Sequence, residues 1–189
     1  MFRKKSSIWL VVLLALISLG LACGGQTDEA NKLINEANAS IDKSRATDTK
    51  ITSLTNELLG ENWTKAEDNE KYKADHKAKF DELISLNDQN EKMMSEASAK
   101  FDQASKMKLE DKFKEYVSFK AQEFKKRAEI YKADGAFVKA FLAEKDAEKA
   151  NTLIVDSNKK SADMLKEATD LDAKAEKIIK DNPSIFKKS

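Results

Sequence analysis

The sequence is short of the residues on which several common protein classes depend. Its 189 residues include one cysteine, one proline, one histidine and five glycines. A disulfide-stapled scaffold needs at least two cysteines, and a collagen-like chain needs far more glycine. A β-sandwich needs more glycine and proline for its many turns. These absences leave an all-α protein as the expected fold class.

The same absences exclude several kinds of site. His76 is the only histidine and Cys23 the only cysteine, so a zinc site lacks its ligands, and we expect no metal and no cofactor. Ser-His-Asp and Cys-His mechanisms would both need His76, which we interpret as a solvated helix residue. No G-x-S-x-G motif and no glycine-rich phosphate loop is present. We therefore expect a protein that is not an enzyme, although composition leaves open a reaction carried by paired carboxylates.

The N-terminus combines positive charge with an apolar run. Arg3, Lys4 and Lys5 precede an apolar block from Ile8 to Leu21 that ends in small residues. This is the layout of a signal peptide. About 14 apolar residues in a helix reach about 21 Å, which is less than the bilayer core of about 30 Å. We therefore expect a signal peptide over residues 1–22 that is cleaved, not a permanent membrane span.

The apolar run ends at Leu19-Gly20-Leu21-Ala22-Cys23. This segment resembles the lipobox of bacterial lipoproteins, in which signal peptidase II cuts before a cysteine that carries diacylglycerol. It departs from the family pattern at Gly20, where leucine is usual. The resemblance implies lipidation at Cys23, with fatty acyl chains such as palmitate holding the protein at a membrane. Two acyl chains anchor a protein stably in a membrane, whereas one acyl chain gives only marginal binding.

An ordinary secretory peptide cut after Ala22 is the alternative. It would leave an unpaired exported thiol, which lipidation of Cys23 avoids. Residues 23–27 form the expected lipidated tether. Gly24 follows the cysteine instead of aspartate, and for a Gram-negative source the resemblance then implies the outer membrane.

The charge pattern gives no support for a nucleic-acid partner. Removal of residues 1–22 leaves 31 basic side chains against 33 acidic ones. Arginine, which favours phosphate and base contacts, occurs after the signal peptide only at Arg45 and Arg127. Lysines alternate with acids along most of the chain, as on a solvated helix surface. We expect contact with a membrane through the lipid, and an envelope protein as partner.

The mature chain is expected to form one helical bundle over residues 28–181, with a C-terminal tail over 182–189. Gly60 and Gly135 are the only strong helix breakers in the long polar-apolar pattern, and Pro183 ends it. We predict antiparallel hairpins that turn near Gly60 and at Asp134–Gly135, giving an elongated bundle or coiled coil. In the first hairpin, we expect Ile41 to face Phe80.

Apolar residues recur with heptad-like spacing in three segments. The first is apolar at five of eight positions: 34, 37, 41, 44, 48, 51, 55 and 58. The second is apolar at six of eight: 80, 83, 87, 90, 94, 97, 101 and 104. The third is apolar at eleven of thirteen: 136, 140, 143, 147, 150, 154, 157, 161, 164, 168, 171, 175 and 178. We expect these positions to face the core.

The polar stretch Asn87-Asp88-Gln89-Asn90 interrupts the middle segment. A turn there would stack two hairpins as a compact four-helix bundle. A continuous helix from Glu61 to Asp134 would instead make a rod of about 110 Å. We favour a bend or break near Asn87.

Two functions from different classes fit this plan. The first is a lipid-anchored helical envelope protein, similar to uncharacterised helical envelope lipoproteins, that acts as a spacer or protein-interaction module. The second is an envelope carrier or chaperone that holds lipid or an unfolded chain in an apolar groove. The second rests on Met93, Met94, Met107 and Met164, because methionine adapts to irregular ligands. Core filling is the simpler explanation of these residues.

Overall fold

The computed structural model describes residues 26–64 and 68–186. Within them the chain forms seven helices: α1 (Gln26–Leu59), α2 (Glu61–Thr64), α3 (Asn69–Asp75), α4 (Lys77–Ser105), α5 (Asp111–Ala143), α6 (Ala147–Asp181) and α7 (Pro183–Phe186). The described residues contain no strand. The expected all-α fold is confirmed.

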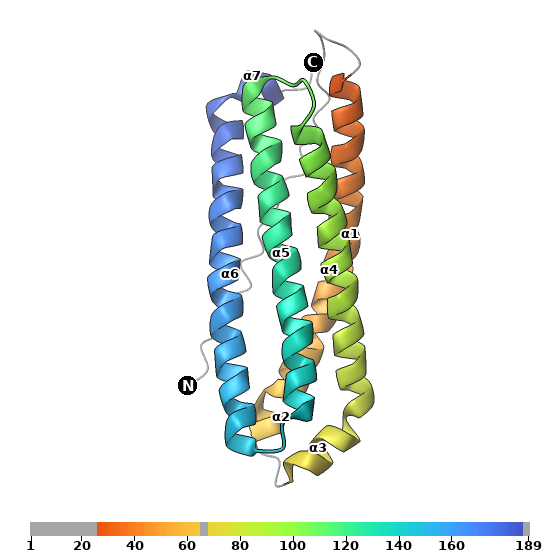
Figure 1. Cartoon of the computed structure of the whole chain (residues 1–189). Helices are drawn as coiled ribbons and strands as arrows, with labels where there is room; N and C mark the ends of the chain where they lie inside the picture. Colours follow the sequence, from red (N-terminus) through yellow and green to blue (C-terminus); the bar gives the residue numbers. More distant parts are fainter. Residues whose placement is uncertain (1–25, 65–67, 187–189) are drawn as a thin grey trace.

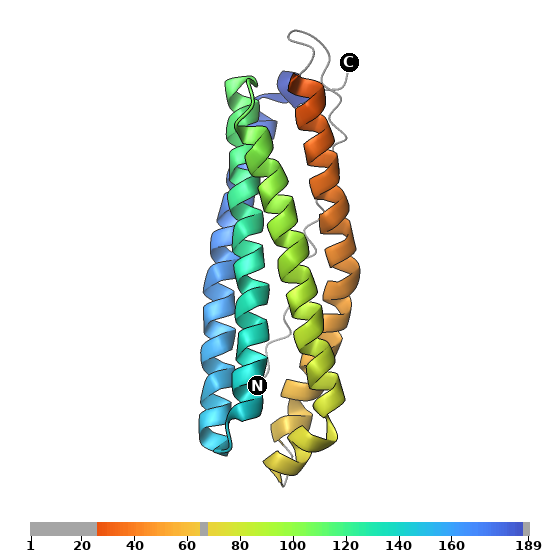
Figure 2. The ribbon, with the colours of Figure 1, turned by 45° about the vertical axis from the view of Figure 1, so that its right-hand side comes forward.

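The four long helices form an elongated antiparallel bundle. α1 packs against α4, α4 against α5, and α5 against α6 (Figure 1). α1 and α6 are the outer members of this array in both views (Figure 2). The longest helix, α6, has 35 residues. The long axis therefore measures about 50 Å, at about 1.5 Å per residue.

The predicted break near Asn87 is wrong, because α4 runs without interruption from Lys77 to Ser105. Asn87 and Asn90 occupy core-facing heptad positions and are 1% and 0% exposed. The Asn87 side-chain amide donates to the carbonyl of Leu83, one turn earlier in the helix, at 2.9 Å. The local polar groups are thus accommodated inside a helix. The chain turns instead at residues 106–110, where the Glu110 side chain accepts from the backbone N–H of Phe113 and caps α5.

The predicted turn at Asp134–Gly135 is also wrong. α5 continues through both residues to Ala143, and the turn comes at residues 144–146. Asp146 accepts hydrogen bonds from the N–H groups of Glu148 and Lys149 at 2.9 and 3.1 Å, which fixes the start of α6. A glycine inside a helix costs only about 1 kcal/mol relative to alanine, so it does not force a turn.

The turn near Gly60 is confirmed, but the expected pairing of Ile41 with Phe80 is wrong. The short helices α2 and α3 lie between α1 and α4, within residues 61–75. α4 therefore begins at Lys77, well after the position at which a tight turn at Gly60 would start the second helix. Glu36 pairs with Lys100 and Glu57 with Lys79, which sets the register of α1 against α4. Ile41 therefore lies in one core cluster with Met94, and Phe80 belongs to another.

Much of the heptad pattern is confirmed. All eight positions of the middle segment are buried, and six of the eight in the first segment are. In the third segment every position from Ala150 to Ile178 is buried or half-buried. Positions 136, 140 and 143 belong to α5 and position 147 begins α6, and all four are exposed.

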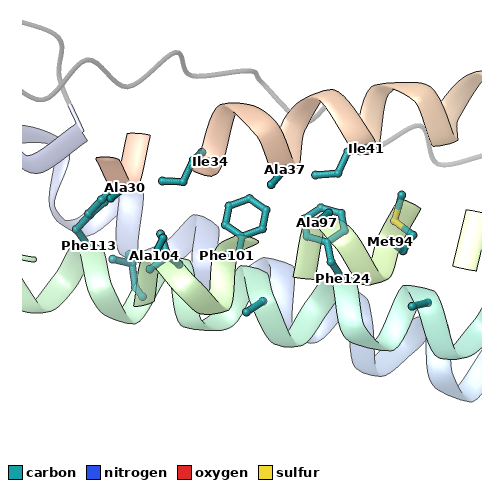
Figure 3. Close-up of a cluster of buried hydrophobic side chains, with 14 of the residues drawn as sticks. Ala30, Ile34, Ala37, Ile41, Met94, Ala97, Phe101, Ala104, Phe113 and Phe124 are labelled. Carbon is teal, nitrogen blue, oxygen red and sulfur yellow. The ribbon is translucent and has the colours of Figure 1, made fainter. Parts of the chain in front are cut away.

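The core divides into two apolar clusters. The first cluster joins α1, α4 and α5 near the start of α1, and Phe101 stacks on Phe124 there with ring centroids 5.5 Å apart (Figure 3). The second cluster lies at the other end, around Leu58, Trp63, Phe80 and Phe141. Each fully buried side chain of this size contributes about 1.5–3 kcal/mol.

Candidate functional site

Cys23, the expected lipidation residue, lies outside the described residues. The described chain begins three residues later, at Gln26, which is also the first residue of α1. The Gln26 side-chain oxygen accepts a hydrogen bond from the backbone N–H of Lys108 at 2.6 Å. This bond ties the start of α1 to the turn between α4 and α5. We call this the near end of the bundle.

The near end is closed by α7, which belongs to the segment expected as a C-terminal tail. Phe186 is 8% exposed, and its ring lies 5.8 Å from that of Phe113 and 5.3 Å from that of Tyr116. Burial raises the pKa of the Tyr116 phenol to about 12. The aromatic contacts hold α7 against α5 at the end where α1 starts.

The opposite end, which we call the far end, joins α2 and α3 to the turn between α5 and α6. Trp63 is 2% exposed and donates through its indole N–H to Asn151 at 2.8 Å. Lys73 is 6% exposed, donates to the carbonyl of Glu144, and lies 5.1 Å from the ring centre of Phe141. This lysine satisfies a carbonyl at the end of α5 and gains a cation–π contact.

His76, expected to be solvated within a helix, lies half-buried at the junction of α3 and α4. Its ring stacks on Tyr72 with centroids 4.2 Å apart, and its Nδ1 lies 2.9 Å from the Tyr72 carbonyl oxygen. His76 therefore contacts Tyr72 at the point where α3 ends and α4 begins, and these contacts belong to the connection between the two helices.

A buried charged cluster between α5 and α6 was not predicted. It consists of Lys120, Glu123 and Asp172, which are 3%, 1% and 3% exposed. The Lys120 ammonium donates to Glu123 and to Asp172, at 2.9 Å for the latter, and Arg127 pairs with Glu123 at 2.7 Å. Burial alone would lower the pKa of Lys120, but the two carboxylates outweigh it and hold that pKa above its usual value.

One signal in the sequence could have revealed this cluster. Lys120 follows Phe113 and Val117 on the core-facing side of α5, and Asp172 lies between Ala168 and Ala175 on that of α6. Charged residues of opposite sign at apolar positions on neighbouring helices point to a buried ion pair. The turn predicted at Gly135 gave the two helices the wrong register, and this hid the pairing.

A layer of polar and small residues separates the two apolar clusters halfway along the bundle. We call it the central layer: Ser44 and Asp48 on α1, Asn87 and Asn90 on α4, Tyr131, Asp134 and Gly135 on α5, and Ser161 on α6. The Asn90 amide donates to the Ser44 carbonyl at 3.3 Å, and Tyr131 donates to Asp48 at 3.0 Å. Ser161 donates to Asp134 at 2.6 Å. These bonds link α1 to α4, α1 to α5, and α5 to α6 at one level.

The central layer contains two polar atoms without a hydrogen-bond partner. They are the side-chain oxygens of Asn87 and Asn90, both fully buried. A buried oxygen left unpaired costs about 1–3 kcal/mol. Burial, followed by the Asp48 carboxylate, raises the pKa of the Tyr131 phenol, while hydrogen bonding from Ser44 and Asn90 opposes this. The central layer is therefore a second polar region of the bundle interior, besides the buried charged cluster of Lys120, Glu123 and Asp172.

The four methionines differ in how deeply they are buried. Met94 lies inside the first cluster and Met107 packs against it, while Met93 and Met164 are half-buried. A shallow depression between α5 and α6 is lined mainly by polar and charged chains, namely Gln122, Lys125, Lys126, Glu129 and Leu171. The position of Met94 favours core filling over a ligand groove.

The described part of the chain has no cluster of three or more histidine, cysteine or acidic residues that could hold a metal ion. Over residues 26–64 and 68–186, no helix is both long and apolar enough to span a bilayer. No family model, curated protein or solved structure matches the chain.

Proposed function

We propose that the chain is a lipid-anchored, non-enzymatic helical protein of the bacterial cell envelope. It acts as a spacer or as a protein-interaction module, and its anchor is Cys23. For a Gram-negative source we propose the outer membrane. The observation that carries this proposal is the place of Gln26, which lies at one end of an elongated bundle and is hydrogen-bonded there to Lys108.

The geometry of the near end supports a short and direct attachment. Three residue steps separate Cys23 from Gln26, and an extended chain covers at most about 11 Å in three steps. A lipid on Cys23 would therefore hold the near end close to the membrane surface. The four long helices then extend away from that end for about 50 Å.

The surface of the bundle supports a role in an aqueous compartment beside a membrane. Exposed ion pairs follow helix spacing, as between Lys77 and Asp81 and between Lys106 and Asp102. Such pairs each contribute little to stability, but they keep the helix surfaces hydrated. A protein partner in the envelope would meet this charged surface or the far end.

The direct test of the anchor is Cys23→Ser. We expect the wild-type protein to partition with the membrane fraction, to incorporate a labelled fatty acid, and to have Cys23 as its modified N-terminal residue by mass spectrometry. Cys23→Ser should lose both the membrane association and the label.

Thr27→Ser is the matched control, since it makes a comparable change four residues later and leaves the cysteine intact. It should behave as the wild type. Membrane association and labelling that persist unchanged in Cys23→Ser would refute the anchor.

A further inference from the structure

We infer that the central layer is an internal hydration site, in which water molecules donate hydrogen bonds to the side-chain oxygens of Asn87 and Asn90. Nothing in the proposed function requires such a site. The inference rests on the two unpaired oxygens, on the size of the residues around them, and on the connection of this layer to the surface.

The two oxygens need donors that the surrounding protein does not supply. Asn87 is 1% exposed and Asn90 is 0% exposed, and neither oxygen has a partner among the described residues. The amide nitrogens are already engaged, with the carbonyls of Leu83 and Ser44. The Tyr131 hydroxyl is also committed, because it donates to Asp48. Water is a small donor able to serve such acceptors, and buried water in proteins typically makes two to four hydrogen bonds.

Three residues at this level are small. Ser44, Gly135 and Ser161 belong to the layer and come from three helices, whereas the flanking clusters include the larger Ile41, Phe124 and Phe141. At Gly135 an added Cβ would lie 3.5 Å from the Cβ of Asn87 and 3.3 Å from the Asp88 carboxylate, so the room beside Asn87 is that of one closely packed methyl group. Polar walls and small side chains are the conditions under which an internal space holds water.

The layer also reaches solvent on its sides. Asp48 is exposed, and the Asp88 side chain, next to Asn87, is 54% exposed. Water can therefore exchange with the layer through a local opening of the bundle, without global unfolding. The inferred water is confined to this layer, which is a polar region between the two apolar clusters.

A high-resolution crystal structure of the chain without residues 1–22 tests the site directly. We expect ordered water within about 3.2 Å of each of the two asparagine oxygens. An electron-density map in which both oxygens contact protein donors directly, with no water between them, would overturn the inference.

Oxygen-17 relaxation dispersion of water provides a test in solution, because it counts long-lived internal water. Asn87→Leu combined with Asn90→Leu should reduce the dispersion amplitude relative to the wild type. Gln89→Ala, an exposed change between the two asparagines, is the matched control and should leave the amplitude unchanged. Circular dichroism of each variant checks that the bundle is intact. Equal amplitudes in the wild type and an intact double variant would also overturn the inference.

Discussion

Gly135 lies inside α5, in its C-terminal third, at a position where its hydrogen side chain faces α4. We predict that Gly135→Ala raises the free energy of unfolding by about 0.5–1 kcal/mol, because alanine has the higher helix propensity. The added Cβ would lie 3.3 Å from the Asp88 carboxylate, whose side chain is 54% exposed and pairs with the exposed Lys139 at 3.5 Å, so it can shift at little cost. Urea unfolding measures the change.

Gly60→Ala is the contrasting substitution. A Cβ at Gly60 would lie 2.3 Å from the backbone carbonyl oxygen of Asn56, which cannot move without distorting the end of α1. This variant should be less stable than the wild type. If Gly135→Ala were as destabilising as Gly60→Ala, the continuous α5 would be contradicted and a turn at Gly135 supported.

Asp172 allows a test of how strongly the bundle depends on one buried charge. Asp172→Ala should lower the free energy of unfolding by about 3 kcal/mol, because it leaves the Lys120 ammonium buried with one fewer partner. Asp170→Ala removes an exposed carboxylate two residues earlier on the same helix. It should change stability by less than about 0.5 kcal/mol. Equal losses in the two variants would show that the buried pair contributes nothing specific.

At the scale of helices, the sequence allowed the class and the faces of the elements to be predicted, but not their ends. The heptad positions of α4 are correct along the whole helix, including Asn87 and Asn90. The turn at Gly135 was misplaced because a glycine inside a helix does not force a turn, and the break near Asn87 was wrong because the polar stretch is accommodated within α4. The side chains of Glu110 and Asp146, each capping the helix that follows, mark the true boundaries.

The candidate sites were harder to predict for a related reason. An ion pair such as Lys120 with Asp172 depends on which helices are neighbours and on their register, and both follow from the turns. The sequence showed the central layer only as an interruption of the apolar pattern at residues 87–90. Such an interruption does not by itself distinguish a turn from asparagines buried inside a helix. That distinction depends on whether neighbouring helices cover the segment.

The turn between α4 and α5 provides a test of the element boundaries. Two glycines inserted after Lys108 lengthen a loop of a few residues, and loop closure entropy changes by only about 0.5 kcal/mol. We expect a loss of stability below about 1 kcal/mol in urea unfolding.

The same two glycines inserted after Asp88 should be far more damaging. They would rotate the second half of α4 by roughly 200°, at 3.6 residues per turn, and turn its buried face outward. We expect severe destabilisation or failure to fold. An insertion after Asp88 that is tolerated as well as the one after Lys108 would contradict the continuous α4.

At the scale of the whole molecule, the two ends of the bundle have different roles in the proposed account. The near end contains Gln26, the start of the described chain, and the far end contains the buried Trp63. After removal of residues 1–22, Trp63 is the only tryptophan in the chain. If Cys23 anchors the chain as proposed, the fluorescence of Trp63 reports on the distance between the far end and the membrane.

Energy transfer from tryptophan to dansyl-labelled lipid headgroups measures that distance most directly, because transfer falls steeply with separation. The lipidated protein is reconstituted into labelled phospholipid vesicles and compared with a variant that combines Trp63→Phe with Leu109→Trp. Leu109 lies in the turn at the near end. The account predicts weak transfer from Trp63 and strong transfer from the tryptophan at position 109. Transfer of equal strength from the two positions would show a bundle that lies flat on the membrane, and would contradict an anchored spacer that extends away from it.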